Sequence, residues 1–338
     1  MASRPSSTRS WQRRCENASR PERRATRSSS PETAVRPTRG SATASARSAG
    51  LPPVSIVVPY AGPSEQLAVV LTGISESDYP AELLQVVVVQ CPSAGSCPAV
   101  WTRLAARVDS RWVRHDRPGF APAGARNAGI AASEGTIIVS LDGDMVTGPG
   151  HVRAHVALQC ARGSTASVGL RRFIRLRSPH PTARVFRSLA ALPNLDRSGS
   201  NRPGHHHDWR GPPIARLSSH PAPYELALGC NLAYPRDVAI AAGGWNTAFD
   251  GSFGYEDIEF ASRLMRVGCT LVWAASAEAL HLEDDRASGW KSDRSRNFEL
   301  ACALIPGFRE HRDARSTRSC PTELATSDSP FPLYVGNG

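Results

Sequence analysis

The stretch TIIVSLDGDM, Thr136 to Met145, decides how the rest of the chain is interpreted. Its first six residues are typical of a strand that is covered on both faces of a sheet. Two carboxylates follow at once, Asp142 and Asp144, and only Gly143 separates them. Like charges this close repel each other unless water or a cation lies between them. The stretch therefore predicts either an Asp-Gly turn or a site for a divalent cation with oxygen ligands.

The residues around this stretch alternate between expected strands and expected helices. In chain order these are a strand at 54–59, a helix at 64–74, a strand at 83–90, a helix at 99–108, a strand at 111–115, a helix at 124–135 and a strand at 136–141. This order predicts an α/β fold with a mainly parallel central sheet and helices on both faces. Ligands of such sheets bind beyond the carboxyl ends of the strands, which is where Asp142 and Asp144 lie.

The second half of the chain has a less regular pattern. Helical spacing dominates 149–192, apart from an expected strand at 166–170. The stretch 193–223 is rich in Gly, Pro, Ser and His, and loops of this length are usually lids, binding loops or disordered segments. The remaining expected elements are a helix at 235–242, a helix that carries Ile258 and Leu264 on its apolar face, and strands at 270–274 and 279–283.

The basic charge of the chain is concentrated at its N-terminus. Residues 1–50 contain eleven arginines and three glutamates, so they carry +8 of the total net charge of +10. This segment has neither hydrophobic periodicity nor the apolar stretch of a secretory signal, so we expect a disordered tail. An arm that binds polyanions is the alternative. We expect one folded domain at 51–300 and a second polar tail at 301–338.

The cysteines give little support for a metal-binding or disulfide framework. The chain has eight of them, and no two form a Cys-x-x-Cys pair. Cys91 and Cys97 flank a short loop and could form a disulfide, whereas Cys230 and Cys269 lie in apolar contexts and are expected to be buried thiols. No run of about 18 apolar residues is present, so we expect a cytoplasmic protein without a transmembrane segment.

A second acidic group stands in GYEDIEF, where Glu256 and Asp257 open an expected helix. Acidic residues at a helix N-terminus are favoured by the helix dipole and need no function. Here, however, they follow a glycine-rich loop with four aromatic residues, which would suit the apolar faces of sugar rings. A carboxylate at this place could take the proton of an acceptor hydroxyl as a general base. The four aromatic residues are Trp245, Phe249, Phe253 and Tyr255.

Histidines supply the remaining candidate metal ligands. His281 lies in the expected strand at 279–283, just before three acidic residues. Its imidazole would complete a mixed oxygen and nitrogen ligand set of the kind that suits manganese, although a structural histidine is the alternative. The triplet His205–His207 is a second candidate cluster, and its place in the long loop favours a solvated segment or a mobile contact with substrate.

Five of these segments together resemble the GT-A-fold glycosyltransferases of family two. In chain order they are VSIVVPY, GARNAGIAASEGTIIVSLDGDM, GCNLAYPRDVAIAAGGWNTAF, FGYEDIEFASRLMRVG and LHLE. The later half is similar to the C-terminal region shared with galactosyltransferases and polypeptide N-acetylgalactosaminyltransferases. The resemblance implies one Rossmann-like GT-A domain. Its parts would be a nucleotide-binding half at 51–148, a variable region with the long loop at 149–228, and an acceptor and catalytic half at 229–300.

The resemblance also implies a role for each matching residue. Asp144 and His281 would bind Mn²⁺ or Mg²⁺, and Asp142 would contact the metal or the ribose of the donor. Asp257 would be the general base of an inverting transfer, while Glu256 would hold the acceptor or the sugar. The other implied positions are Pro59, Tyr60, Gln90, Arg126, Asn127 and Gly143 for the donor, and Trp245, Phe253 and Tyr255 for the acceptor. At the end of the second strand the family usually has an Asp, where this chain has Gln90 and Cys91.

The expected function is metal-dependent transfer of a sugar from a nucleotide sugar, such as a UDP-sugar, to a sugar, peptide or small-molecule acceptor. A non-catalytic relative that binds nucleotide sugars or carbohydrate is one alternative. A nucleotidyltransferase is another, but it would need a glycine-rich loop with Arg and Lys where PYAGPSEQ stands at 59–66. Nucleic-acid binding would depend on the charge of the N-terminal tail alone, so we expect no nucleic-acid partner.

Overall fold

The computed structural model describes residues 50–175, 205–206, 208–283 and 294–318. The expected N-terminal tail at 1–50 lies almost entirely outside this part of the chain, as does the first part of the long loop. The side chains of the His205–His207 triplet also lie outside the described part. Where the long loop is described, it contains a short helix, α8 (Gly211–Ile214), and is not structureless.

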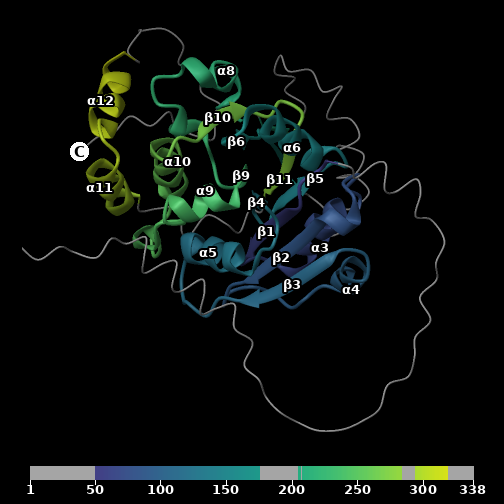
Figure 1. The fold of residues 1–338 in the computed structure, drawn as a ribbon. Helices are drawn as coiled ribbons and strands as arrows, with labels where there is room; N and C mark the ends of the chain where they lie inside the picture. The colour runs from purple at the N-terminus through teal and green to yellow at the C-terminus, as the bar shows by residue number, and fades with distance from the viewer. Residues whose placement is uncertain (1–49, 176–204, 207, 284–293, 319–338) are drawn as a thin grey trace, which may run out of the picture.

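A seven-stranded sheet forms the centre of the molecule (Figure 1). The strand order is β10-β6-β9-β4-β1-β2-β3, and every strand except β9 runs in the same direction. The mainly parallel sheet confirms the predicted α/β fold class. The bounds are β1 Val54–Tyr60, β2 Leu84–Gln90, β3 Asp109–Arg114, β4 Ile137–Leu141, β6 Thr165–Val168, β9 Asn231–Pro235 and β10 Thr270–Trp273.

The reversed strand β9 brings two distant parts of the chain together. It lies between β4 and β6, and Asn231 at its start pairs with Leu141 at the end of β4. The residues just before β9 therefore lie beside the residues just after β4. The backbone N–H of Asp142 donates to the carbonyl oxygen of Cys230 at 3.3 Å. This contact places the acidic turn next to the Gly229–Cys230 segment.

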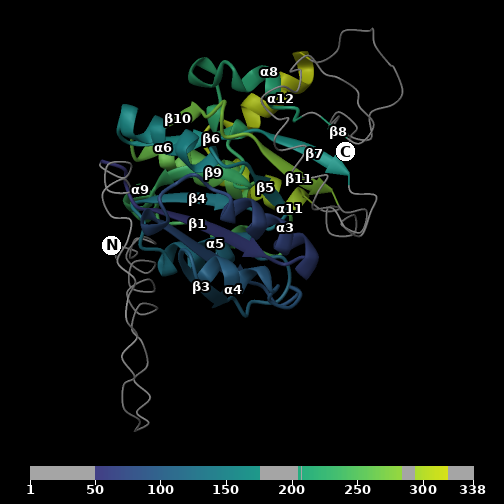
Figure 2. The same cartoon turned by 90° about the vertical axis from the view of Figure 1, so that its right-hand side faces the viewer.

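A second sheet of four strands lies beside the carboxyl end of β4 (Figure 2). Its order is β5-β11-β7-β8, with bounds Met145–Thr147, Ala279–Glu283, Arg171–Arg175 and His205–His206. Only β11 among these was expected, because the helical spacing of 149–192 concealed β7. In this sheet His281 pairs with Met145 on one side and with Phe173 on the other. The second sheet thus places His281 beside Met145, the residue that follows Asp144.

Helices cover both faces of the large sheet, as predicted. β1 shows why, since Ile56 and Val58 belong to one core cluster while Val57 belongs to another. The first cluster is completed by residues of α3, α4 and α6, and the second by residues of α5, α9 and α10. The bounds are α3 Ser64–Ser75, α4 Val100–Ala105, α5 Pro122–Ala132, α6 His151–Arg162, α9 Arg236–Ala241 and α10 Glu256–Arg266.

The structure corrects the expectation of a polar tail from 301 onward. Two helices, α11 (Ser295–Leu304) and α12 (Phe308–Arg318), pack beside α10 (Figure 1). Their buried residues Ala301, Ile305 and Phe308 form a third core cluster with the aromatic side chains before α10. The sequence of α12 is almost entirely polar, so its single anchoring residue, Phe308, gives no hydrophobic period to recognise.

The cysteine side chains in the described part of the chain are free thiols. Cys91 and Cys97 are not bridged, which resolves the alternative that their spacing left open. Cys230 and Cys269 are buried, as expected. Among the described residues, no helix is both long enough and apolar enough to cross a membrane.

Candidate active site

The acidic turn at 142–144 packs tightly against the end of β1. It closes with a hydrogen bond of 3.0 Å from the backbone N–H of Met145 to the carbonyl oxygen of Asp142. A Cβ on Gly143 would lie only 2.9 Å from the carbonyl oxygen of Pro59, so a side chain at 143 would force the turn away from β1. Tyr60 is fully buried beneath this contact. The structure thus brings the predicted donor-side residues Pro59, Tyr60 and Gly143 together through their backbones.

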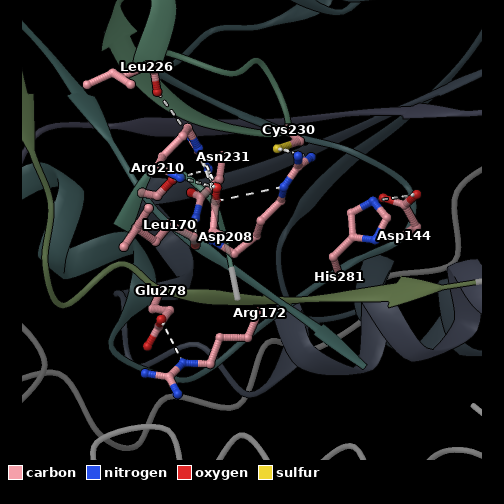
Figure 3. A network of polar contacts seen from close by, with 12 residues as sticks. Asp144, Leu170, Arg172, Asp208, Arg210, Leu226, Cys230, Asn231, Glu278 and His281 are labelled. Carbon is pink, nitrogen blue, oxygen red and sulfur yellow. Dashed lines mark hydrogen bonds and ion pairs between the residues drawn. The ribbon is translucent and has the colours of Figure 1, made fainter. Parts of the chain in front are cut away.

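Asp144, in the turn between β4 and β5, faces His281 of β11. The Nε2 atom of His281 lies 3.4 Å from the Oδ2 atom of Asp144, as Figure 3 shows. The backbone N–H of Leu282 donates to the carbonyl oxygen of Asp144 at 2.9 Å, which fixes the spacing of the two elements. The other carboxylate oxygen, Oδ1, is buried and has no partner among the described residues. Burial raises the pKa of Asp144, and the neighbouring imidazole opposes that shift.

These side chains fit a divalent cation only in part. Asp142 was expected to join Asp144 and His281 as a metal ligand, but its Oδ1 atom accepts a hydrogen bond of 2.7 Å from Arg126. Within the described ranges, no three His, Cys, Asp or Glu side chains form a ready metal-binding group. The Asp144–His281 pair does offer an unpartnered carboxylate oxygen and an imidazole, which is a suitable donor set for Mn²⁺. Cations held by so few protein ligands normally take further oxygens from bound phosphates.

Arg126 is a buried bridge between the two acidic segments. Its side chain, from α5, donates to Asp142 at 2.7 Å and to Glu256 at 3.3 Å. The guanidinium carbon lies 4.5 Å from the ring centroid of Trp245, which supports it from behind. Gly229 allows this packing, because a Cβ there would lie 2.7 Å from Trp245 and 3.0 Å from Arg126. Sequence analysis placed Arg126 at the nucleotide, whereas the structure uses its charge to hold two carboxylates.

Glu256 and Asp257 begin α10, directly after a residue with an unusual backbone. Tyr255 has a φ of 69°, and it is the single non-glycine residue with a positive φ in the described part of the chain. Burial, and next the charge of Asp257, raises the pKa of Glu256 to about 7, against the effect of Arg126. Burial also raises the pKa of Asp257, which is the more exposed of the two. A carboxylate with a raised pKa is a better proton acceptor near neutral pH.

The aromatic residues before α10 are more deeply buried than expected. Trp245 is 1 % exposed and stacks on Phe260, with ring centroids 4.2 Å apart. Tyr255 is also buried and packs on Phe298 of α11. Their rings therefore support the site from below, which corrects the expectation that they face the acceptor. Phe253 keeps partial exposure and lies beside Phe120.

Two further predicted donor residues use their side chains within the protein. The side-chain amide of Asn127 donates to the backbone carbonyl oxygen of Trp245 and accepts from the backbone N–H of Trp245, each at 2.7 Å. The amide of Gln90 accepts from the indole of Trp112 at 3.0 Å and donates to the carbonyl oxygen of Gly95 at 3.1 Å. Asn127 thus fixes a loop, and Gln90 has a set orientation at the end of β2.

Sequence analysis missed Arg171, which lies on the same side as Asp144. Its Nη1 atom lies 3.7 Å from the sulfur of Cys230, and its Nε atom lies 3.8 Å from Asp208. Against the effect of burial, Cys230, Asp208, Asp144 and Asp142 all raise the pKa of Arg171. Asp208 is itself held by the buried side chain of Arg210 (Figure 3). One arginine in the run RRFIRLR carries no signal of this role, and the run was expected to be helical.

Comparisons with known proteins agree with this geometry. Residues 55–210 match the model of the family described as glycosyl transferase family 2. The chain is 26 % identical to chondroitin synthase of Escherichia coli over 284 residues, which cover 77 % of this chain and 39 % of that protein. It is 26 % identical to hyaluronan synthase of Pasteurella multocida over 186 residues, which cover 52 % and 19 %. The chain therefore spans less than half the length of these curated relatives.

One solved structure supports the fold assignment. The crystal structure of GalNAc-T7 with UDP, GalNAc and Mn²⁺ has a TM-score of 0.50 and 15 % identity, with 72 % of this chain and 45 % of that chain covered. At this identity the likeness concerns the fold alone, and it agrees with the predicted GT-A architecture. The family model ends at residue 210, so the expected likeness of the later half to galactosyltransferases stays a prediction.

Proposed function

We propose that this protein is a metal-dependent glycosyltransferase that moves a sugar from a nucleotide-sugar donor to an acceptor with inversion at the anomeric carbon. One observation carries the proposal. Two acidic segments from distant parts of the chain, Asp142–Asp144 and Glu256–Asp257, are joined by one buried arginine, Arg126. This bridge fixes a donor side and an acceptor side in a single frame, as an in-line displacement requires.

The donor side combines Asp144, His281 and Arg171. Asp144 and His281 would hold Mn²⁺ or Mg²⁺ together with the donor's diphosphate, and a metal bound there neutralises the charge that develops on the leaving group. Arg171 brings a second positive charge to the same side, because its guanidinium interacts with both Asp144 and Asp142. GalNAc-T7, which shares the fold, was solved with UDP and Mn²⁺, so UDP-sugars are the first donors to test.

The acceptor side depends on Asp257. Its carboxylate is partly exposed, its pKa is raised by burial, and it lies at the N-terminus of α10. As general base it would take the proton of an acceptor hydroxyl while that oxygen attacks the anomeric carbon. The nucleoside diphosphate would leave from the opposite face, which gives inversion. With a pKa of about 7, Glu256 is partly protonated at neutral pH and could donate a hydrogen bond to the acceptor or sugar.

The test combines donor binding with turnover. Thermal stabilisation by a panel of nucleotide sugars is measured with and without MnCl₂, followed by release of the nucleoside diphosphate in the presence of saccharide acceptors. We expect stabilisation that needs the metal. Asp257→Asn should keep that stabilisation but lower turnover by about 10²–10⁴-fold, because the amide cannot accept the proton. Glu278→Gln, a change of the same chemistry at a carboxylate paired with Arg172, is the control.

Three outcomes would contradict parts of the proposal. Full turnover by Asp257→Asn would remove the assignment of the base. Equal donor binding with and without the metal would remove the metal requirement. Binding without turnover for every donor and acceptor would favour the alternative, a non-catalytic relative that binds nucleotide sugars.

A further inference from the structure

The loop that leads into α10 is held from outside by one side chain of α11. We define this catalytic loop as residues 249–255, directly before Glu256. Asn297 is fully buried, and its Nδ2 atom donates to the carbonyl oxygens of Phe249 at 2.9 Å, Ser252 at 3.0 Å and Gly254 at 3.0 Å. An amide has two N–H groups, so one of them is shared between two carbonyls. Three bonds from one side chain define the path of nearly the whole loop.

The catalytic loop needs such support because its backbone is unfavourable. Gly251 and Gly254 have φ values of 98° and 89°, and Tyr255 has a φ of 69°. For Tyr255 the left-handed region is sterically unfavourable, and such residues persist only where the surroundings fix them. The ring of Tyr255 packs against Phe298 and Phe308, with centroid distances of 5.7 Å and 6.0 Å. The two C-terminal helices thus hold the residue directly before Glu256 and Asp257.

The opposite end of the loop is fastened to α5, the helix that carries Arg126. The carboxylate of Asp250 accepts from the backbone N–H groups of Ala123 at 3.0 Å and Gly124 at 3.2 Å. Its side chain is completely buried. The catalytic loop therefore lies between a donor-side helix and α11. Removal of the α11 contacts would free the acceptor side and leave the attachment to α5 in place.

We propose that Asn297 is a positioning residue for the acceptor side, and that α11 and α12 are part of the catalytic unit. Asn297 holds the catalytic loop in the conformation that places Asp257 at the start of α10. Asp144 and His281 belong to other elements and do not depend on this contact. The kinetic consequence rests on the proposed function: loss of Asn297 should lower turnover while donor binding stays unchanged.

The kinetic test uses Asn297→Ala, with Val156→Ala as the matched control. Val156 is buried in α6, so its truncation also weakens the core but touches neither the loop nor the acids. We expect kcat to fall about 10–100-fold in Asn297→Ala, because small displacements of reacting groups have effects of that order. The donor Kd should stay within about twofold of wild type. Equal kcat values in the two variants, or a parallel loss of donor binding, would overturn the proposal.

A second measurement does not depend on activity and separates this inference from the proposed function. Amide hydrogen exchange of residues 249–259 should accelerate in Asn297→Ala, while the amides of β1 and β4 keep their protection. Arg296→Ala removes an exposed side chain that donates to the carbonyl oxygen of Ala248 at 2.9 Å and to the Oδ1 atom of Asn297 at 3.0 Å. Asn297 keeps its three bonds to the loop in this variant, so the protein should fold normally and the loop should loosen more weakly. Unchanged exchange of the loop in both variants would overturn the positioning role. A wild-type protein without transfer activity would refute the proposed function, but the exchange experiment would still decide this inference.

Discussion

Two buried groups of polar side chains flank the start of β9, and they differ in how fully their hydrogen bonds are satisfied. Behind the strand, the Oδ1 atom of Asn231 lies 3.0 Å from the Nε2 atoms of both His151 and His155. The Nδ2 atom of Asn231 donates to the carbonyl oxygens of Leu170 and Ala277. Because carbonyls only accept, the amide orientation is fixed, and both histidines must donate from Nε2.

This histidine cluster is neutral and almost complete. The Nδ1 atom of His155 lies 2.8 Å from the hydroxyl of Ser167, which leaves Nδ1 of His151 as its one buried ring nitrogen without a partner. Burial lowers the pKa of His151 to about 4 and that of His155 to about 3. An uncharged group whose polar atoms are nearly all paired within the protein stabilises the scaffold and leaves a single ring nitrogen without a partner.

The acidic group around Arg126 and Asp144 has the opposite character. Five of its side chains each have a buried nitrogen or oxygen without a hydrogen-bond partner among the described residues. They are Arg126, Asp144, Arg171, Glu256 and His281. Buried polar groups are nearly always satisfied in folded proteins, so such a concentration indicates a ligand site. The comparison teaches that incomplete hydrogen bonding, more than residue type, distinguishes a functional cluster from a structural one.

The largest expected effect tests the acidic group. Asp144→Asn should weaken metal-dependent nucleotide-sugar binding by at least about 1,000-fold, because the charge that balances the cation is lost. Isothermal titration calorimetry with Mn²⁺ and the best donor measures the change, and Glu278→Gln is the control. The unfolding free energy of Asp144→Asn should be unchanged or higher, since burial already disfavours the ionised carboxylate. A large loss of stability would place Asp144 among the structural groups.

The next effect tests the structural side. Asn231→Leu keeps the approximate volume but removes the partner of two imidazole N–H groups and of the carbonyl of Ala277, while the carbonyl of Leu170 keeps the backbone N–H of Ala279. We expect a loss of about 3 kcal/mol in unfolding free energy, measured by urea denaturation. Metal-dependent donor binding by the remaining folded protein should be near wild type. A stability change below about 0.5 kcal/mol would show that the histidine cluster does not hold the scaffold.

The smallest expected effects concern the pH dependence of the unfolding free energy. The histidine cluster and the acidic group should contribute to it with opposite signs. His155 has a pKa of about 3 in the folded protein and 6.5 as its ordinary value. The unfolded chain therefore binds the proton first, and stability is lost as pH falls below about 6.5. Glu256 has a pKa of about 7 against an ordinary 4.5, so the folded protein binds that proton first and stability is lost as pH rises from about 4.5 to about 7.

Single variants can separate these contributions. His155→Gln should lose less stability than wild type between pH 6.5 and pH 5, by at most about 1.4 kcal/mol per pH unit. Glu256→Gln should lose less stability than wild type as pH rises across the same range. Urea denaturation at pH 5, 6 and 7 measures both slopes. For each variant, the difference in unfolding free energy from wild type is followed with pH. If the two differences changed with pH in the same direction, the protonation state inferred for one of the two groups would be contradicted.

Much of the fold was predictable from the sequence because its strands are runs of β-branched residues, as in β1 and β2. The acids at 142–144 and 256–257 were recognisable because they stand at the ends of elements, and His281 because acidic residues follow it. The partners were not predictable. Arg126 sits in an ordinary helical pattern, and its contact with Glu256 depends on how α5 and α10 pack. Trp245 was assigned to the surface because its neighbours are glycines and polar residues, although it fills the space behind Arg126.

The reversed strand β9 also has a consequence for synthesis on the ribosome. β4 emerges long before residues 231–235, yet its open edge can be covered only by β9. A nascent chain that ends before residue 235 presents an unpaired apolar edge, which invites aggregation and chaperone binding. Translation of β9 then covers this edge, and α10 and β10 can be added only afterwards. Truncated messages should therefore yield insoluble product instead of a soluble N-terminal half.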